Sequence, residues 1–223
     1  MAGRVDGFYL TGGTALSLIY FQHRESYDID LFTKEFSGKR ILDVVDYLNK
    51  EPGVSIKFVA EQTNDKMAKA AVYTMVFEDQ TVGKIDFVED FVEILKPLRM
   101  VDGIPVLSIE DIYLRKIYTM AGSLKSLNNL GAEVMIGGRQ EAKDFYDLYC
   151  LSHTSMRLSE FVKQYGHPVM KEGIVQWFST FDRMHIKTGL LDLIVAQEID
   201  YRPMEAHFKK EVDKIILDMI EEK

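Results

Sequence analysis

The sequence is short of several residue types, and each shortage excludes a class of protein. A single cysteine, Cys150, rules out an intrachain disulfide and favours a reducing, cytoplasmic setting. Only five residues are proline and no long polar tract occurs, which argues against extended disorder. No run approaches the roughly eighteen apolar residues of a membrane span, so we expect no membrane association. The N-terminal segment also lacks the apolar core of a signal peptide.

The sequence also has no excess of positive charge. The formal net charge is −8, whereas proteins that coat nucleic acid without specificity are usually basic. Any contact with nucleic acid should therefore be local. The 223 residues, 47% of them hydrophobic, suffice for one large domain or two small ones with a sizeable core.

Hydrophobic periodicity divides the chain into a mixed half and a helical half. The first half alternates predicted strands, at 7–13, 27–33, 54–60, 71–79 and 80–91, with predicted helices at 14–23 and 38–53. The second half is mostly helical, with helices predicted at 108–122, 139–152, 158–166, 173–184 and 203–223. We expect an α/β or α+β domain over residues 1–105 and a helical domain over 106–223. Residues 122–138, rich in Gly, Ser and Asn, are predicted to form a long loop.

One short stretch, LTGGTALSLIYFQHRESYDIDLF, combines a glycine turn with two aspartates. Gly12 and Gly13 end a predicted strand, and such glycines let backbone amides approach a phosphate closely. Thr14 adds a hydroxyl donor at the start of the following helix. Asp28 and Asp30 occupy alternate positions of the next strand, so their side chains share one face.

Two carboxylates this close repel each other unless a cation lies between them, and Mg²⁺ prefers such oxygen ligands. A third carboxylate, Asp86, interrupts the apolar strand 80–91. Together with Asp28 and Asp30 it could hold two Mg²⁺ ions for an in-line phosphoryl displacement. Each part has a plainer interpretation: a simple turn for the glycines, solvated charges for the aspartates. Only their combination in this order and spacing is specific.

The same stretch resembles the signature of the nucleotidyltransferase superfamily related to DNA polymerase β. More narrowly it is similar to the AbiEii-type branch of abortive-infection and toxin–antitoxin nucleotidyltransferases, which shows G-G-T-A-L followed by H-R-x-S-x-D-I-D-L-F. The segments DIYLRKIYTMAG and RQEAKDFYDLYCL resemble the later motifs of that branch, so that the likeness covers roughly residues 8–151. The resemblance implies an α+β fold: a polymerase β-type catalytic domain with a small mixed sheet, followed by a helical domain that closes the active-site cleft.

The resemblance also implies roles for individual residues. The implied metal-binding and catalytic set is Asp28, Asp30 and Asp86, joined by Lys116 and Asp144 as catalytic residues. The candidate nucleotide-binding set is Gly12, Gly13, Thr14, Arg24, Ser26, Arg139 and Lys143, of which the resemblance implies Arg139 and Lys143. Arg24 could bind phosphate or help order the loop before Asp28, and Ser26 could be a simple loop hydroxyl. Arg139, Lys143 and Asp147 are spaced four apart, which predicts one helical stripe. The plainer interpretation of that stripe is a salt-bridged surface face.

Lys116 interrupts the apolar stripe of helix 108–122, because Ile112 and Met120 each lie four residues away. A buried ammonium is costly unless it finds a partner, and the alternative is that it reaches solvent at the helix edge. The resemblance implies that Lys116 faces the same cleft as Asp28 and contacts nucleotide phosphate. Asp144 is its expected counter-charge without nucleotide. On these grounds Lys116→Met should leave stability near the wild-type value or raise it.

The resulting hypothesis is an Mg²⁺-dependent transfer of a nucleoside monophosphate from an NTP to an acceptor hydroxyl. The resemblance implies an RNA end, chiefly tRNA, or a protein as acceptor, and a cognate antitoxin as partner. Two alternatives stay open. One is a small-molecule nucleotidyltransferase of the antibiotic-modifying type, to which the acidic charge is mildly favourable. The other is a non-catalytic nucleotide-binding module, against which the intact aspartates argue.

Overall fold

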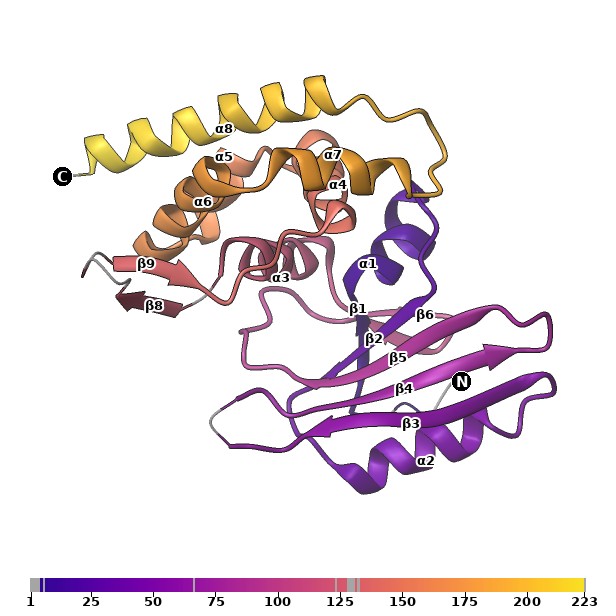
Figure 1. The fold of residues 1–223 in the computed structure, drawn as a ribbon. Coiled ribbons are helices and arrows are strands. Elements are labelled where there is room, and N and C mark those ends of the chain that lie inside the picture. The colour runs from indigo at the N-terminus through magenta and orange to yellow at the C-terminus, as the bar shows by residue number, and fades with distance from the viewer. Residues whose placement is uncertain are drawn as a thin grey trace. The chain divides into compact units, whose positions relative to one another are not determined.

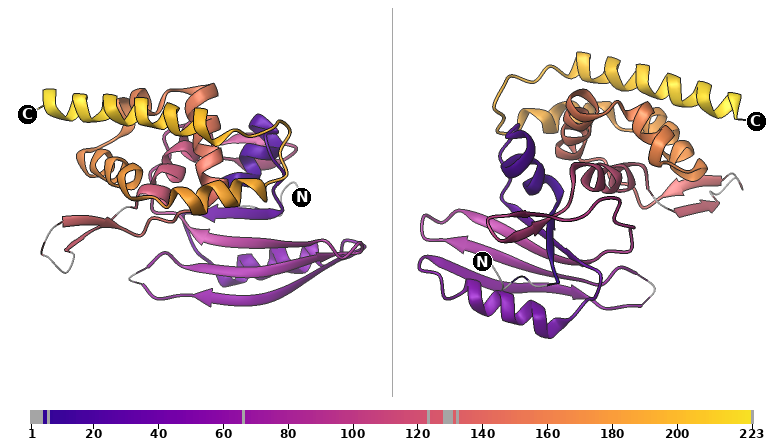
Figure 2. Two further views of the ribbon diagram at one scale, coloured as in Figure 1. Left: turned by 45° about the horizontal axis from the view of Figure 1, so that its top comes forward. Right: turned by 180° about the vertical axis from the view of Figure 1, so that it is seen from behind.

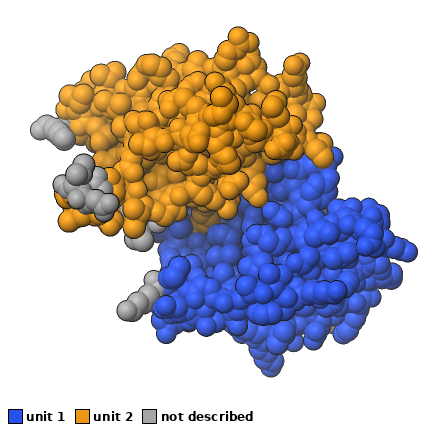
Figure 3. Space-filling model, in the orientation of Figure 1, with its two compact units in different colours: residues 1–112 blue, residues 113–223 orange. Residues whose placement is uncertain are grey.

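The computed structural model describes residues 5, 7–65, 67–122, 124–127, 131 and 133–222. The chain forms two compact units, residues 1–112 and 113–223, which Figure 3 colours separately. The division falls inside one helix, α3 (Ile109–Ala121). The ribbon of each unit can be followed in Figures 1 and 2.

Unit 1, residues 1–112, is built on a seven-stranded mixed sheet. Its strands lie in the order β3-β4-β5-β2-β1-β7-β6. The strands are β1 (Tyr9–Thr11), β2 (Asp28–Thr33), β3 (Val54–Gln62), β4 (Ala70–Phe77), β5 (Val82–Glu89), β6 (Arg99–Val101) and β7 (Ile104–Val106). The pairs β2–β5 and β1–β7 are parallel, and the other described pairs are antiparallel.

One face of this sheet is covered by α2 (Gly38–Leu48), as Figures 1 and 2 both show. The Ser37 side chain caps the helix by accepting a hydrogen bond from the Arg40 amide. On the covered face, Phe87 packs edge-to-face against Phe8 and Tyr73, with ring centroids 5.3 and 5.8 Å away. Because strand side chains alternate, the residues between these core positions face away from α2.

A helix follows β1 with no intervening loop. It begins as α1 (Gly12–Ala15) and continues as the π-helical segment η1 (Leu16–Phe21). Ala15 and Leu16 are fully buried, so this helix is anchored by its own apolar residues. The two glycines therefore lie in the first helical turn rather than in a separate loop, and backbone amides of that turn have no intrahelical acceptor.

Helix α3 begins with a capping box, as its sequence predicts. The Ser108 hydroxyl oxygen accepts a hydrogen bond from the Asp111 amide at 3.1 Å and donates its proton to the Asp111 carboxylate at 2.6 Å. The same carboxylate accepts the backbone amides of Leu95 and Lys96. Asp111 is fully buried, and these four bonds satisfy it.

Unit 2, residues 113–223, is mainly helical. Its elements after α3 include α4 (Ala142–Cys150), the π-helical η2 (Leu151–Ser155), α5 (Leu158–Tyr165), α6 (Pro168–Thr180), α7 (Arg183–Leu191) and α8 (Tyr201–Glu221). Phe145 is the centre of the core, with the rings of Trp177, Tyr201 and Phe208 at 6.2, 5.8 and 4.9 Å. Trp177 is thus a core residue. Within the described part of the chain, no helix has both the length and the apolar character that crossing a membrane requires.

The expectation of a long loop over 122–138 is wrong for most of its described residues. Strands β8 (Leu124–Leu127) and β9 (Glu133–Ile136) form an antiparallel hairpin, while residues 123, 128–130 and 132 lie outside the described set. The Gln176 side chain bonds both backbone groups of Met135, accepting at 2.7 Å and donating at 2.9 Å. The Gln176 side-chain amide thus satisfies the Met135 backbone groups as a neighbouring strand would. Composition does not reveal such a long-range contact.

Candidate functional site

The predicted aspartates lie on two adjacent parallel strands of unit 1. In the register of β2 and β5, Asp30 is directly opposite Asp86, and Asp28 is directly opposite Lys84. Directly opposite side chains project from the same face, so all three carboxylates share it. The intervening Ile85 is fully buried on the other face. The alternation that put Asp28 and Asp30 together thus extends across the strand pair to Asp86.

Gly12 makes room for one of these carboxylates. Its φ of +71° lies in the left-handed region, which favours glycine. A Cβ atom at this position would lie 1.9 Å from Oδ2 of Asp30, far inside van der Waals contact. The sequence favoured Gly12 as an approach point for phosphate. The structure gives it a further requirement: no side chain fits between the helix start and Asp30.

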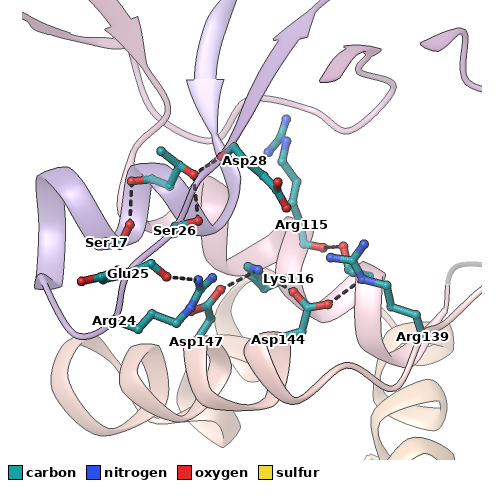
Figure 4. Close-up of polar contacts among 12 residues, drawn as sticks. Ser17, Arg24, Glu25, Ser26, Asp28, Arg115, Lys116, Arg139, Asp144 and Asp147 are labelled. Carbon is teal, nitrogen blue, oxygen red and sulfur yellow. Dashed lines mark hydrogen bonds and ion pairs between the residues drawn. The ribbon is translucent and has the colours of Figure 1, made fainter. Parts of the chain in front are cut away.

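Thr14 ties the glycine turn to the aspartate strand. Its buried hydroxyl donates to the backbone carbonyl of Asp28 and lies 2.9 Å from the Ser26 hydroxyl oxygen. Because the single Thr14 proton goes to Asp28, Ser26 is the donor in the second bond. Ser17 in turn donates to the Thr14 carbonyl at 3.2 Å, and these bonds are drawn in Figure 4. The contacts fix the start of β2 relative to α1.

Arg24, another predicted phosphate contact, precedes β2 and is largely buried. One of its guanidinium nitrogens donates to the Glu25 carbonyl at 2.9 Å. The neighbouring His23 is also buried, with its ring edge-to-face against Phe21 at 5.8 Å. Both side chains therefore take part in ordering the segment that leads into Asp28.

Lys84 is a site residue that sequence reasoning missed. Its ammonium lies 2.7 Å from Oδ2 of Asp86, and its side chain is 44% exposed. Burial lowers the pKa of Lys84, but the nearby carboxylates of Asp86, Asp28 and Asp30 outweigh burial and raise the pKa overall. The signal was present in the sequence, since Lys84 is two residues before Asp86 and shares its face.

The carboxylates of this face meet some requirements of a metal site. Oδ1 of Asp86 is buried and has no hydrogen-bond partner among the described residues, which leaves an acceptor oxygen available for a ligand. Asp30 lies opposite it in register, and oxygen donors of this kind suit Mg²⁺. As the side chains are arranged, however, no three acidic, histidine or cysteine side chains of the described residues gather closely enough to hold a metal ion.

A second charged cluster, in unit 2, is centred on Lys116. Its ammonium lies 2.6 Å from Oδ1 of Asp144 and 2.7 Å from Oδ2 of Asp147, as Figure 4 shows. The Lys116 side chain is 7% exposed, and both carboxylates are fully buried. Burial lowers the pKa of Lys116, but Asp147 and Asp144 outweigh it and raise the pKa, so the ammonium is retained. Asp144 was the expected partner, and Asp147 was not foreseen.

Arg139 completes the cluster from outside the helix. The predicted stripe of Arg139, Lys143 and Asp147 on one helix is wrong, because α4 begins only at Ala142 and Arg139 precedes it. Its Nε nevertheless donates to Oδ2 of Asp144 at 2.5 Å. Burial raises the pKa of Asp144, but the two cations Lys116 and Arg139 outweigh it and hold the pKa below its usual range.

The comparison with known proteins is decisive for the family. A family model described as nucleotidyl transferase AbiEii toxin, Type IV TA system, matches residues 3–220, nearly the whole chain. The chain belongs to the AbiEii nucleotidyltransferase toxin family. The predicted resemblance is thereby confirmed, and with it the assignment of the protein as a toxin-type nucleotidyltransferase.

Solved structures support the same fold for this AbiEii family member. A putative nucleotidyltransferase from Helicobacter pylori is 15% identical, with a TM-score of 0.60 over 98% of this chain and 91% of that one. JHP933 from the same organism, also 15% identical, gives 0.59 over 98% and 88%. The MenT4 nucleotidyltransferase toxin from Mycobacterium tuberculosis, 12% identical, gives 0.59 over 94% and 75%. No curated protein sequence matches significantly. The predicted α+β fold class is confirmed.

Proposed function

We propose that this family member transfers a nucleoside monophosphate from an NTP to a hydroxyl of an RNA end, chiefly tRNA, or of a protein. In this reaction the acceptor oxygen forms a bond to the α-phosphorus. The bond from the α-phosphorus to the oxygen bridging it to the β-phosphorus breaks, and pyrophosphate leaves with that electron pair. The acceptor proton passes to a carboxylate of the site, for which Asp86 is the candidate.

The observation that carries this proposal is the carboxylate face of β2 and β5. Asp30 on β2 lies opposite Asp86 on β5, and Asp28 is two residues from Asp30 on β2. Within the described part of the chain, the buried Oδ1 of Asp86 has no hydrogen-bond partner. Asp28, Asp30 and Asp86 would hold one or two Mg²⁺ ions, which supply positive charge beside the phosphates and assist ionisation of the acceptor. The Asp86 oxygen is suited either to a cation or to the acceptor proton, because no protein donor occupies it.

The start of α1 is proposed to bind phosphate. The Thr11 side chain does not cap the start of α1, the first-turn amides have no intrahelical acceptor, and a helix N-terminus favours negative charge. Thr14 and Ser26 hold this turn beside Asp28 through their hydrogen bonds. We assign them the positioning of the turn, in addition to the nucleotide contact that the family motif implies.

Lys116 and Asp144 are proposed to act in the reaction from unit 2. The carboxylates of Asp144 and Asp147 keep this buried ammonium charged, and a contact with phosphate requires that charge. Arg139, 52% exposed, and Lys143 on α4 are proposed as further phosphate contacts. The family description also supports a cognate antitoxin that opposes the enzyme in its host.

A labelling assay tests the proposal. The protein is incubated with each α-³²P-labelled NTP, Mg²⁺, and either total cellular RNA or RNase-treated lysate, after which RNA and protein are separated. Label in the RNA or protein fraction that disappears with chelator and with Asp28→Asn would support the proposal. Absence of label from both fractions with all four NTPs would contradict it, and a new labelled small-molecule product distinct from the NTP would favour the antibiotic-modifying alternative.

A further inference from the structure

Lys84 occupies the position where a cation would be expected on the carboxylate face. It is directly opposite Asp28 in the strand register and two residues from Asp86, so it shares the face of all three aspartates. Its ammonium lies 2.7 Å from Oδ2 of Asp86, the distance of a charge-assisted hydrogen bond. The carboxylate face thus carries a counter-cation of its own, the Lys84 ammonium.

The two carboxylate oxygens of Asp86 differ in their hydrogen-bond partners. Oδ2 is held by Lys84, whereas Oδ1 is buried and meets no hydrogen-bond partner in the part of the chain that the structure describes. A divalent ion that bound Asp86 would compete with the ammonium for this carboxylate and would be repelled by it at close range.

Lys84 is also able to move. Its side chain is 44% exposed and has a flexible four-carbon stem, unlike a lysine fixed in a core. A triphosphate arriving at this face would offer the released ammonium a new anionic partner. Metal without nucleotide brings no new anion to this face.

We propose that Lys84 is a positioning residue that neutralises Asp86 in the nucleotide-free enzyme and yields its place when metal arrives together with NTP. Lys84 thereby weakens binding of the free divalent ion and couples metal retention to nucleotide. This inference rests on the proposed metal-dependent nucleotidyl transfer and adds the residue that sets its order of assembly.

The test measures metal affinity instead of turnover. Mn²⁺ binding is followed by electron paramagnetic resonance, with and without a non-hydrolysable NTP analogue, in the wild type and in Lys84→Met. The matched control is Lys57→Met: Lys57 is an exposed lysine in the same cross-strand row, two strands beyond Lys84 through Thr74. This control shows whether removing any positive charge from the same sheet face changes the Mn²⁺ affinity.

Lys84→Met should tighten binding of free Mn²⁺ by about tenfold or more, because a unit positive charge a few Å from the ion is removed. The enhancement of Mn²⁺ affinity by the analogue should shrink, and Lys57→Met should behave as the wild type. Unchanged or weaker Mn²⁺ binding in Lys84→Met would overturn the inference. If neither the wild type nor the two variants bound Mn²⁺ even with the analogue, the proposed metal-dependent function would itself be wrong. This result differs from an unchanged affinity in Lys84→Met alone.

A second measurement uses only the wild type and does not depend on the folding of a variant. Lysine acetylation with a limiting reagent, read by mass spectrometry, should modify Lys84 several-fold faster when Mn²⁺ is saturating, because the ammonium has lost its partner. Lys57 provides the internal reference within the same sample. An unchanged Lys84 rate at saturating Mn²⁺ would show that metal does not displace it.

Discussion

Replacing Lys116 by Met should destabilise the protein, contrary to the expectation from sequence. That expectation treated Lys116 as a single costly charge on an apolar helix face. In the structure its ammonium instead neutralises two fully buried carboxylates, Asp144 and Asp147, at 2.6 and 2.7 Å. Methionine would restore the packing volume but leave those carboxylates without their shared cation.

The magnitude follows from what remains after the substitution. Breaking a buried ion pair by removing one partner costs about 3–5 kcal/mol, because the other charge stays buried and uncompensated. Arg139 still reaches Asp144, so this carboxylate keeps one cation. We therefore expect a loss near the lower end, about 3 kcal/mol, a large share of the stability of a typical protein.

The pH dependence gives the prediction a second signature. In the wild type, Lys116 and Arg139 overcome the effect of burial and lower the pKa of Asp144, so this carboxyl stabilises the fold at neutral pH and loses that contribution in acid. Without Lys116, the pKa of Asp144 would lie higher than in the wild type, because burial would be opposed by Arg139 alone, and protonation would relieve the uncompensated charge. The stability difference between wild type and variant should therefore narrow as the pH falls from about 8 towards about 5.

Denaturant unfolding followed by Trp177 fluorescence measures this effect directly, because the protein has one tryptophan and it lies in the core of unit 2. The double variant Lys116→Met/Asp147→Asn should recover part of the stability without recovering nucleotidyl transfer. Lys163→Met, which removes an exposed lysine of the same unit, should change stability by less than about 0.5 kcal/mol. A Lys116→Met protein as stable as the wild type at neutral pH would refute the reasoning.

Three further outcomes are expected. Gly12→Ala should abolish transfer and destabilise the fold by roughly 1–3 kcal/mol, because the added Cβ collides with Asp30 at a positive φ; Gly38→Ala, which meets nothing within 4 Å, should be near neutral in unfolding and activity assays. Asp28→Asn should lose transfer in the labelling assay and retain wild-type circular dichroism, since removing like-charge repulsion rarely unfolds a protein. Burial lowers the pKa of His207, so the unfolded state takes up its proton first and stability should fall as the pH drops below about 6.5; His207→Gln should flatten this part of the pH–stability curve.

Local pattern was sufficient to predict part of the carboxylate face. The alternation of side chains along a strand put Asp28 and Asp30 on one side, and the register agrees. The pairing of Asp30 with Asp86 was not derivable, because β2 and β5 are parallel neighbours separated in sequence by α2, β3 and β4. Only the fold decides which residue of a distant strand lies opposite which.

The errors have the same physical origin. The segment 122–138 has the composition of a loop, yet β9 is held by the Gln176 side chain from a helix far along the chain. Asp147 looked like a member of a surface stripe, because spacing along a helix gives the relative directions of side chains and not their burial. Its complete burial depends on the packing of α4 within unit 2, which no local pattern encodes.

Lys84 and Lys116 both form ion pairs with carboxylates, but they differ in burial, and we expect different roles for them. Each ammonium lies within 2.7 Å of a carboxylate, and in each case the carboxylates raise the lysine pKa against the effect of burial. Lys116 is enclosed, so removing it should cost stability at neutral pH whether or not ligand is present. Lys84 is 44% exposed, and an exposed ion pair contributes about 0–1 kcal/mol. Its removal should therefore leave the unfolding curve nearly unchanged while altering metal affinity. A large stability loss in Lys84→Met would mean that its contact with Asp86 is a structural bridge, and a cation arriving from solution would not displace it.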